Sequence, residues 1–182
     1  MTEPFPQFRY HPEPLATGSI VPSTTVCRRC SRVRGYIYVG PVFAVADLDE
    51  AICPWCIADG SAAREFEAEF TDSAGVGDYG SWDAVPTAVV EEVSQRTPGF
   101  SGWQQERWWT HCGDAAAFLG RAGRREVETR WPDVVAALKK EAGMEGETWD
   151  EYFAALDADG SPTAYIFRCR GCGQLGGYSD CD

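Results

Sequence analysis

The sequence has few basic residues and no long apolar run. Its 182 residues include 28 acidic and 16 basic side chains, which give a formal net charge of −12. This charge repels nucleic acid and anionic membranes and attracts basic partners. No stretch approaches the roughly 18 consecutive apolar residues of a transmembrane helix, and the acidic, proline-rich start is unlike a signal peptide. We therefore expect a cytoplasmic protein with no membrane association, for which nucleic acid is a poor partner.

The sequence also lacks the common catalytic motifs. Its two histidines, His11 and His111, belong to no H-E-x-x-H helix, and no glycine-rich loop of the phosphate-cradling kind is present. Whether the protein is an enzyme stays open, and these absences favour a non-enzymatic role. Hydrophobic residues make up 44% of the chain and aromatic residues 13%, which is typical of a folded domain with its own core.

Eight cysteines stand out in a chain that is expected to be cytoplasmic, where metal ligation or thiol chemistry is more common than disulfides. Four of them form the pattern C-x2-C-x22-C-x2-C, at Cys27, Cys30, Cys53 and Cys56. Two CxxC turns brought together by a hairpin supply the four thiolates that tetrahedral Zn²⁺ needs. The alternative is a redox dithiol in the CPWC sequence, but a redox dithiol needs no second pair. Asp59 and Gly60 also weaken the long helix that such a dithiol would open.

The other four cysteines are spaced less regularly. Cys169 and Cys172 make another CxxC turn, and we expect Cys112 to share their metal ion. The fourth ligand is Cys181 or His111. Adjacent residues seldom point at one ion, so we favour Cys181 and expect two zinc ions in all. If water holds the fourth position instead, the cluster becomes a candidate site for a zinc-dependent hydrolase.

We predict an α+β fold in three parts that form one compact unit. Residues 1–26 should run extended across the surface, and residues 27–80 should form a zinc-ribbon-like module around a β-hairpin broken at Gly40 and Pro41. Residues 81–182 should be mainly helical and close with the CxxC knuckle. Apolar residues recur at helical spacing near 63–70, 85–93, 131–138 and 149–156. A short helix over 115–120, capped by Asp114, and a strand over 163–167 complete the prediction.

Several side chains are candidates for contact with a partner. Trp103, Arg107 and Trp108 lie close together in the sequence GWQQERWWTHC, where core packing is the alternative role for the tryptophans. Asp72 and Asp78 belong to an acidic loop on which a basic protein could dock. Arginines crowd the first CxxC pair, where they offset thiolate charge or, in a nucleic-acid-binding hypothesis, contact phosphate: Arg28, Arg29, Arg32 and Arg34.

Four stretches together resemble the CbrC family of bacterial proteins: FRYHPEPLATGS, CPWCIADGSAA, RTPGFSGWQQERWWTHCGDAAAFLG and FRCRGCG. The resemblance extends from about Phe8 to the C-terminus and implies a cytoplasmic protein with a role in colicin tolerance or immunity. It also implies a further cysteine at the position of Ala116, which this chain lacks. With the charge, it leads us to expect a zinc-stabilised acidic protein that binds a basic protein, such as a bacteriocin or toxin domain.

Overall fold

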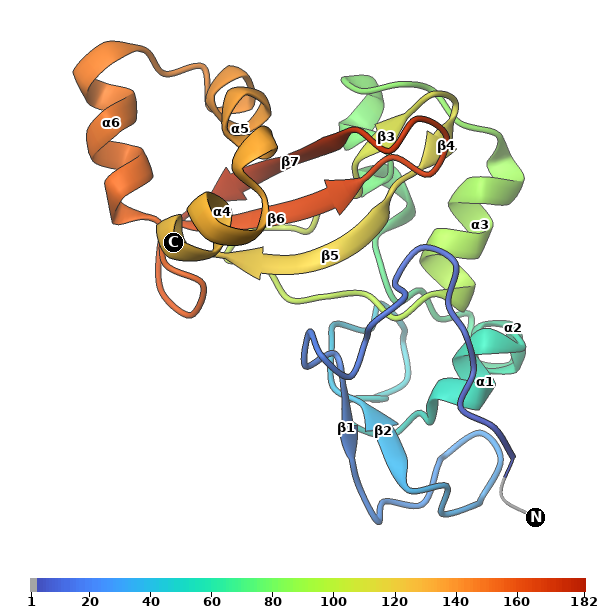
Figure 1. Ribbon diagram of the computed structural model, residues 1–182. Coiled ribbons are helices and arrows are strands. Elements are labelled where there is room, and N and C mark those ends of the chain that lie inside the picture. Colours follow the sequence, from blue (N-terminus) through green and yellow to red (C-terminus); the bar gives the residue numbers. More distant parts are fainter. Residues whose placement is uncertain (1–2) are drawn as a thin grey trace.

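A computed structural model describes residues 3–182 and shows two lobes (Figure 1). We call residues 18–70 the N-terminal lobe and residues 71–182 the C-terminal lobe. The mixture of short helices and small sheets confirms the α+β class. In the part of the chain that the structure describes, no helix is long and apolar enough to cross a membrane.

The N-terminal lobe consists of short elements around one hydrophobic core. These elements are β1 (Ile20–Pro22), β2 (Tyr36–Tyr38), α1 (Pro54–Ala58) and α2 (Ser61–Phe66). β1 and β2 pair antiparallel. The predicted hairpin around Gly40 and Pro41 is therefore wrong in its pairing, because β2 takes its partner strand from residues 1–26. Ile20 of β1 and Ile37 of β2 are both buried in the core of this lobe.

The C-terminal lobe is larger and contains the main sheet. Its elements in chain order are η1 (Ser73–Gly75), η2 (Asp78–Gly80), α3 (Thr87–Arg96), β3 (Thr110–His111), β4 (Asp114–Ala115), β5 (Ala117–Ala122), α4 (Arg124–Arg130), η3 (Pro132–Val134), α5 (Val135–Ala142), α6 (Gly146–Ala155), β6 (Thr163–Arg168) and β7 (Leu175–Asp180). β5, β6 and β7 form an antiparallel sheet in that order, and β3 and β4 form a separate hairpin.

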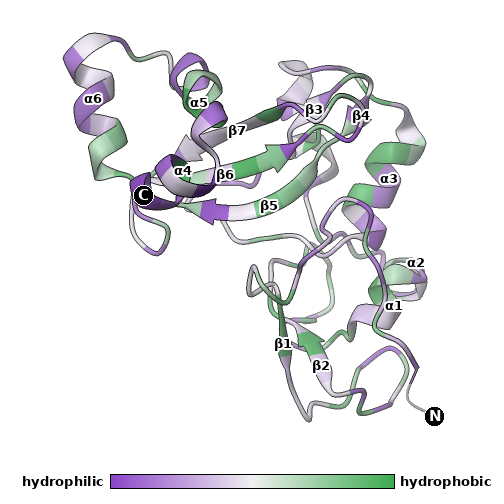
Figure 2. Ribbon diagram, in the orientation of Figure 1, coloured by the Kyte–Doolittle hydropathy of each residue, from purple (hydrophilic) through white to green (hydrophobic). Residues whose placement is uncertain are grey.

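The three-stranded sheet separates two hydrophobic cores, because neighbouring residues of a strand point to opposite faces. On β6, Tyr165 and Phe167 belong to an aromatic core with Trp108, whereas Ala164 and Ile166 belong to the core under α4, α5 and α6. The middle of β5 and of β6 is coloured hydrophobic in Figure 2, as expected for strands that are covered on both faces. The prediction of a mainly helical portion misses this sheet.

The predicted helix over 115–120 is wrong, because this segment contains the end of β4 and most of β5. Phe118 is buried and pairs with Phe167 of β6. Buried and less buried residues alternate along β5, as expected for a strand. The sequence does not show this alternation clearly, because the segment begins with small alanines. Asp114 therefore caps no helix.

The other periodic segments are close to prediction. The segment near 85–93 is α3, the segment near 131–138 is η3 followed by α5, and the segment near 149–156 is α6. α5 ends at Ala142 and is capped by Gly143, whose φ of 64° is left-handed and suits glycine. α2 ends at Phe66, so Phe70 lies beyond the helix that its spacing predicted.

Residues 3–17 contact both lobes and are more than a surface segment. Phe8 is buried in the core of the N-terminal lobe, and Tyr10 is buried in the aromatic core of the C-terminal lobe. His11 has no exposed surface, and its Nδ1 lies 2.7 Å from the carbonyl oxygen of Pro98. A carbonyl can only accept, so Nδ1 carries a proton, and Nε2 lies 2.6 Å from the Thr17 hydroxyl, which is 3.3 Å from the Pro14 carbonyl oxygen. The segment thus joins the lobes through buried, specific contacts.

Candidate metal centres

The first CxxC pair and the CPWC sequence meet in the N-terminal lobe. The sulfur atoms of Cys27, Cys30, Cys53 and Cys56 all lie within 4.8 Å of one another. The Sγ separations are 3.9 Å for Cys27 and Cys56, 3.9 Å for Cys30 and Cys53, and 3.6 Å for Cys53 and Cys56. Ligands at the corners of a tetrahedron with Zn–S bonds of about 2.3 Å are about 3.8 Å apart. The group therefore has the spacing of a tetrahedral zinc site, and none of its cysteines forms a disulfide.

Local backbone geometry brings these four thiols together. Val26 and Val33 form an antiparallel bridge that closes the first CxxC turn, and Ser31 completes the turn with a positive φ of 54°. Cys53 is the N-cap residue of α1, and Pro54 occupies the first helical position, where its missing N–H has no cost. The N–H of Cys53 lies 3.3 Å from Cys27 Sγ, to which it donates a hydrogen bond. α1 is only five residues long, unlike the long helix of a redox CPWC protein.

The electrostatics of this group favour a cation. The Cys53 thiol donates a hydrogen bond that lowers the pKa of Cys27 to about 4, and the same interaction with burial raises the pKa of Cys53 far above its usual value. Burial also raises the pKa of Cys56 to about 12. Hydrogen bonding thus favours a thiolate at Cys27, whereas burial and the neighbouring sulfur atoms oppose ionisation of Cys53 and Cys56. A divalent cation would let all four ionise.

The second group lies at one end of the main sheet and contains His111, Cys112, Cys169 and Cys172. His111 Nδ1 is 3.2 Å from Cys112 Sγ and 3.6 Å from Cys172 Sγ. Tetrahedral zinc with one nitrogen and three sulfur ligands places these atoms about 3.5 Å apart. Cys169 is buried, and its sulfur accepts the N–H of Cys172 at 3.5 Å, whereas Cys112 and Cys172 are exposed. Burial opposes ionisation of Cys169, but hydrogen bonds led by that N–H lower its pKa to about 6.

A tight hairpin explains how two adjacent residues join one group. His111 and Asp114 pair across the β3–β4 hairpin, and the two residues between them have positive φ values, 56° at Cys112 and 70° at Gly113. Two consecutive left-handed residues are typical of a type I′ turn, which reverses the chain within two residues. The expectation that neighbours seldom share an ion does not apply to this backbone.

Cys181, which the sequence favoured as the fourth ligand, belongs to neither group. It follows β7, a strand of six residues that leads away from the Cys172 turn and spans roughly 20 Å. Its carbonyl oxygen accepts a hydrogen bond from Gln104, and its side chain is exposed. The structure thus places His111, the alternative ligand, where Cys181 was expected.

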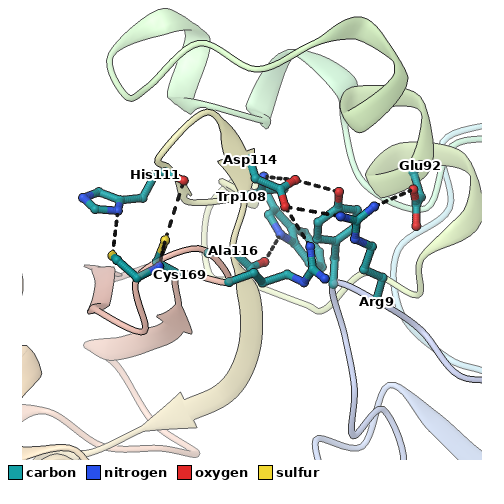
Figure 3. Close-up of polar contacts among 11 residues, drawn as sticks. Arg9, Glu92, Trp108, His111, Asp114, Ala116 and Cys169 are labelled. Carbon is teal, nitrogen blue, oxygen red and sulfur yellow. Dashed lines mark hydrogen bonds and ion pairs between the residues drawn. The ribbon is translucent and has the colours of Figure 1, made fainter.

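An ion-pair network connects the two loops of the second group (Figure 3). Asp114 follows the β3–β4 turn, and its Oδ2 lies 2.7 Å from Arg170, which stands between Cys169 and Cys172. Its Oδ1 accepts the Tyr10 hydroxyl at 2.7 Å, and Arg9 approaches its Oδ2 at 3.6 Å. Burial and the Asp114 carboxylate both raise the pKa of Tyr10, so Tyr10 stays a donor. Sequence reasoning missed this role of Asp114, since its partners are distant in the chain.

The candidate partner-binding residues have different environments. The prediction that Trp108 contacts a partner is wrong, because this side chain is fully buried and donates its indole N–H to the carbonyl oxygen of Ala116. Trp103 is 44% exposed, and its indole N–H donates to the Gly160 carbonyl oxygen at 2.8 Å. Arg107 forms ion pairs with Asp78 at 3.2 Å and with Glu141 at 2.9 Å.

Asp72 and the arginines near the first CxxC pair also have partners within the protein. Asp72 accepts the N–H of Ala74 at the start of η1 and the side-chain amide of Gln105. Arg28 donates to the carbonyl oxygen of Asp47, Arg29 pairs with Glu65 at 2.8 Å, and Arg34 pairs with Glu3. These contacts favour charge compensation over phosphate binding.

Comparison with known proteins gives the family. The model of the uncharacterised protein family UPF0167 matches residues 5–181. UPF0167 proteins of Mycobacterium tuberculosis and Mycobacterium bovis are each 52% identical over 180 residues, which cover 96% of this chain and 92% of the relative. A UPF0167 protein of Pseudomonas aeruginosa is 46% identical over 176 residues, which cover 96% of both chains. No solved structure matches.

The chain therefore belongs to the UPF0167 family. The expected membership in the CbrC family is wrong, because neither the family model nor these relatives names that family or colicin tolerance. The tolerance and immunity role inferred from the resemblance loses its basis with it. The two metal-ligand groups stand independently, because they rest on the geometry of the side chains.

Proposed function

We propose that this member of the UPF0167 family is a non-enzymatic zinc protein that holds two structural ions. The observation that carries the proposal is the first group, in which the Sγ separations of 3.6 to 3.9 Å match the edges of a zinc–thiolate tetrahedron. The second ion is held by His111 and three cysteines. Zinc is the metal of choice, because thiolate and imidazole ligands in a closed set of four are typical of structural zinc.

The first ion has a clear structural task. The N-terminal lobe has two strands of three residues and two helices of five and six residues. Such short elements bury little apolar surface, and small units of this kind usually need a metal or disulfides for stability. A zinc ion would join the first CxxC turn to α1 and so close the core of a zinc-ribbon-like module.

The second ion would join the β3–β4 hairpin to the turn between β6 and β7. The network from Asp114 to Arg170 supports this role, because it fixes the same two loops from outside the ligand set. Four protein ligands leave no coordination position for a catalytic water. The geometry therefore favours a structural ion over the zinc-dependent hydrolase alternative.

The test is to count zinc per chain by native mass spectrometry in matched variants. We expect two ions in the wild-type chain, one in Cys56→Ser and one in His111→Ala. Cys181→Ser is the matched control, because it removes a thiol that belongs to neither metal-ligand group, and it should keep both ions. Two ions in His111→Ala together with one in Cys181→Ser would overturn the second ligand set. A wild-type chain without zinc would overturn the proposal as a whole.

A further inference from the structure

The C-terminal lobe contains an open groove, and His111 is the one member of the metal-ligand groups among its lining residues. The volume of the groove is about 900 Å³, within the range of pockets that bind small molecules or a few side chains. Its lining comes from η3, α5, the loop around η2, β3 and the start of β7 with the two residues before it. We call this surface the acidic groove. Four carboxylates and two indoles are prominent among its lining side chains: Asp78, Asp83, Asp133, Glu141, Trp82 and Trp109.

The negative charge of the acidic groove is only partly compensated. Lys140 is the one lysine or arginine among the lining residues, which also include His111 of the second metal-ligand group. Arg107, which lies outside the lining, pairs with two of the four carboxylates, those of Asp78 and Glu141. Four carboxylates thus share two cations. A concave surface with surplus negative charge focuses the field and concentrates cationic ligands.

Arg107 shows what kind of cation these walls accept. Its guanidinium lies over the ring of Trp82, a lining residue, 5.3 Å from the centroid, and over the ring of Tyr178, which is outside the lining, at 4.2 Å. The Trp82 indole N–H points to the same Glu141 carboxylate, at 3.4 Å. A planar cation between aromatic faces and carboxylates is the arrangement for which arginine is better suited than lysine.

Two carboxylates remain for a second cation. Asp133 is exposed and forms neither a hydrogen bond nor an ion pair with the side chains that the structure describes. Asp83 accepts the N–H of Cys112 through Oδ2, at 2.8 Å, which leaves Oδ1 for another donor. We propose that the acidic groove binds an arginine side chain presented by a basic partner polypeptide. The proposal requires no metal, because none of the four carboxylates belongs to either metal-ligand group.

The test follows the tryptophan indole N–H signals of the ¹⁵N-labelled full chain during titration with the peptide Gly-Arg-Gly-Arg-Gly at low salt. We expect the signals of Trp82 and Trp109 to move, while those of Trp131 and Trp149, buried in the core under the helices, stay in place. Replacing the arginines of the peptide with lysine should weaken binding, because an ammonium lacks the planar face.

Matched variants separate the groove from the net charge of the chain. Asp133→Asn should weaken peptide binding about threefold to fivefold, which is the size of one partly exposed ion pair. Asp150→Asn is the control, because it removes the same charge from an exposed position on α6, outside the groove, and should leave binding unchanged. Lys140→Glu should strengthen binding.

Three results would overturn the proposal. Equal weakening by Asp133→Asn and Asp150→Asn would show that the peptide follows only the overall charge of −12. Indole signals of Trp82 and Trp109 that stay in place would put the peptide elsewhere. Equal affinity for spermidine would mean that any cation suffices and that arginine in a polypeptide is not what the groove recognises.

Discussion

His11 should make the stability of the protein depend on pH in a way that can be calculated. Its side chain has no exposed surface, and its two nitrogens are used by uncharged partners, the Pro98 carbonyl and the Thr17 hydroxyl. Burial lowers the pKa of His11 to about 4, and the hydrogen bond to Pro98 offsets only part of that effect. The imidazole is therefore neutral in the folded protein at pH values where it is charged in the unfolded chain.

The sign and size of the effect follow from linkage. Above about pH 6.5, His11 is neutral in both states and stability does not depend on it. Below that value the unfolded chain binds a proton that the folded protein does not, so the free energy of unfolding falls until about pH 4. The difference between a pKa of about 6.5 and one of about 4 corresponds to about 3 kcal/mol, of which about 2 kcal/mol should be lost by pH 5.

Urea unfolding at several pH values between 7.5 and 4.5 measures this loss. His11→Asn is the comparison, because its amide can still donate to Pro98 but does not titrate. Both proteins are measured with excess zinc, so that protonation of the metal ligands affects them equally. The wild-type advantage in unfolding free energy should shrink by about 2 kcal/mol between pH 7.5 and pH 5. A constant difference across this range would refute the neutral, buried assignment of His11.

Three further predictions concern the metal groups and the sheet. Cys56→Ser should unfold the N-terminal lobe, because a structural zinc contributes on the order of 10 kcal/mol in small zinc domains. Limited proteolysis should then cut within residues 18–70 and spare the main sheet, and protection of that lobe would contradict the role of the ion. Asp114→Asn should weaken zinc binding at the second group about tenfold, measured by chelator competition, and leave the first ion unaffected; equal affinity would show that the Arg170 contact positions nothing. Gly176→Ala should cost about 1 to 3 kcal/mol in urea unfolding, since an added Cβ would overlap the Trp109 indole, and an unchanged midpoint would mean that the ring has room to move.

The sequence was most informative where the pattern was local. The two CxxC pairs of the first group could be grouped from spacing alone, because each CxxC turn presents two thiols to the same side. α3, α5 and α6 were also predictable, because apolar residues at helical spacing need a covered face. In both cases the information lies within a few residues of the chain.

Long-range pairing explains most of what could not be predicted. β1 pairs with β2 across the first CxxC turn, and no sequence signal links Ile20 to Tyr38. Trp108 gives no sign in the sequence that it is the buried member of its run, because its burial depends on Phe100, Phe118 and Phe167 from other segments. His111, not Cys181, joins the second group because Cys112 has a positive φ that turns the chain sharply. Gly113 was the one residue in the sequence that indicated such a turn.

The most direct test of the two-ion account is X-ray absorption at the zinc edge of the wild-type protein. The two ligand groups together offer seven sulfur atoms and one nitrogen atom to two ions. Two zinc ions in these groups should therefore give a shell dominated by sulfur at about 2.3 Å, with a small nitrogen contribution at about 2.0 Å. A shell of sulfur alone would point to Cys181 in place of His111. A shell rich in oxygen would contradict closed structural sites.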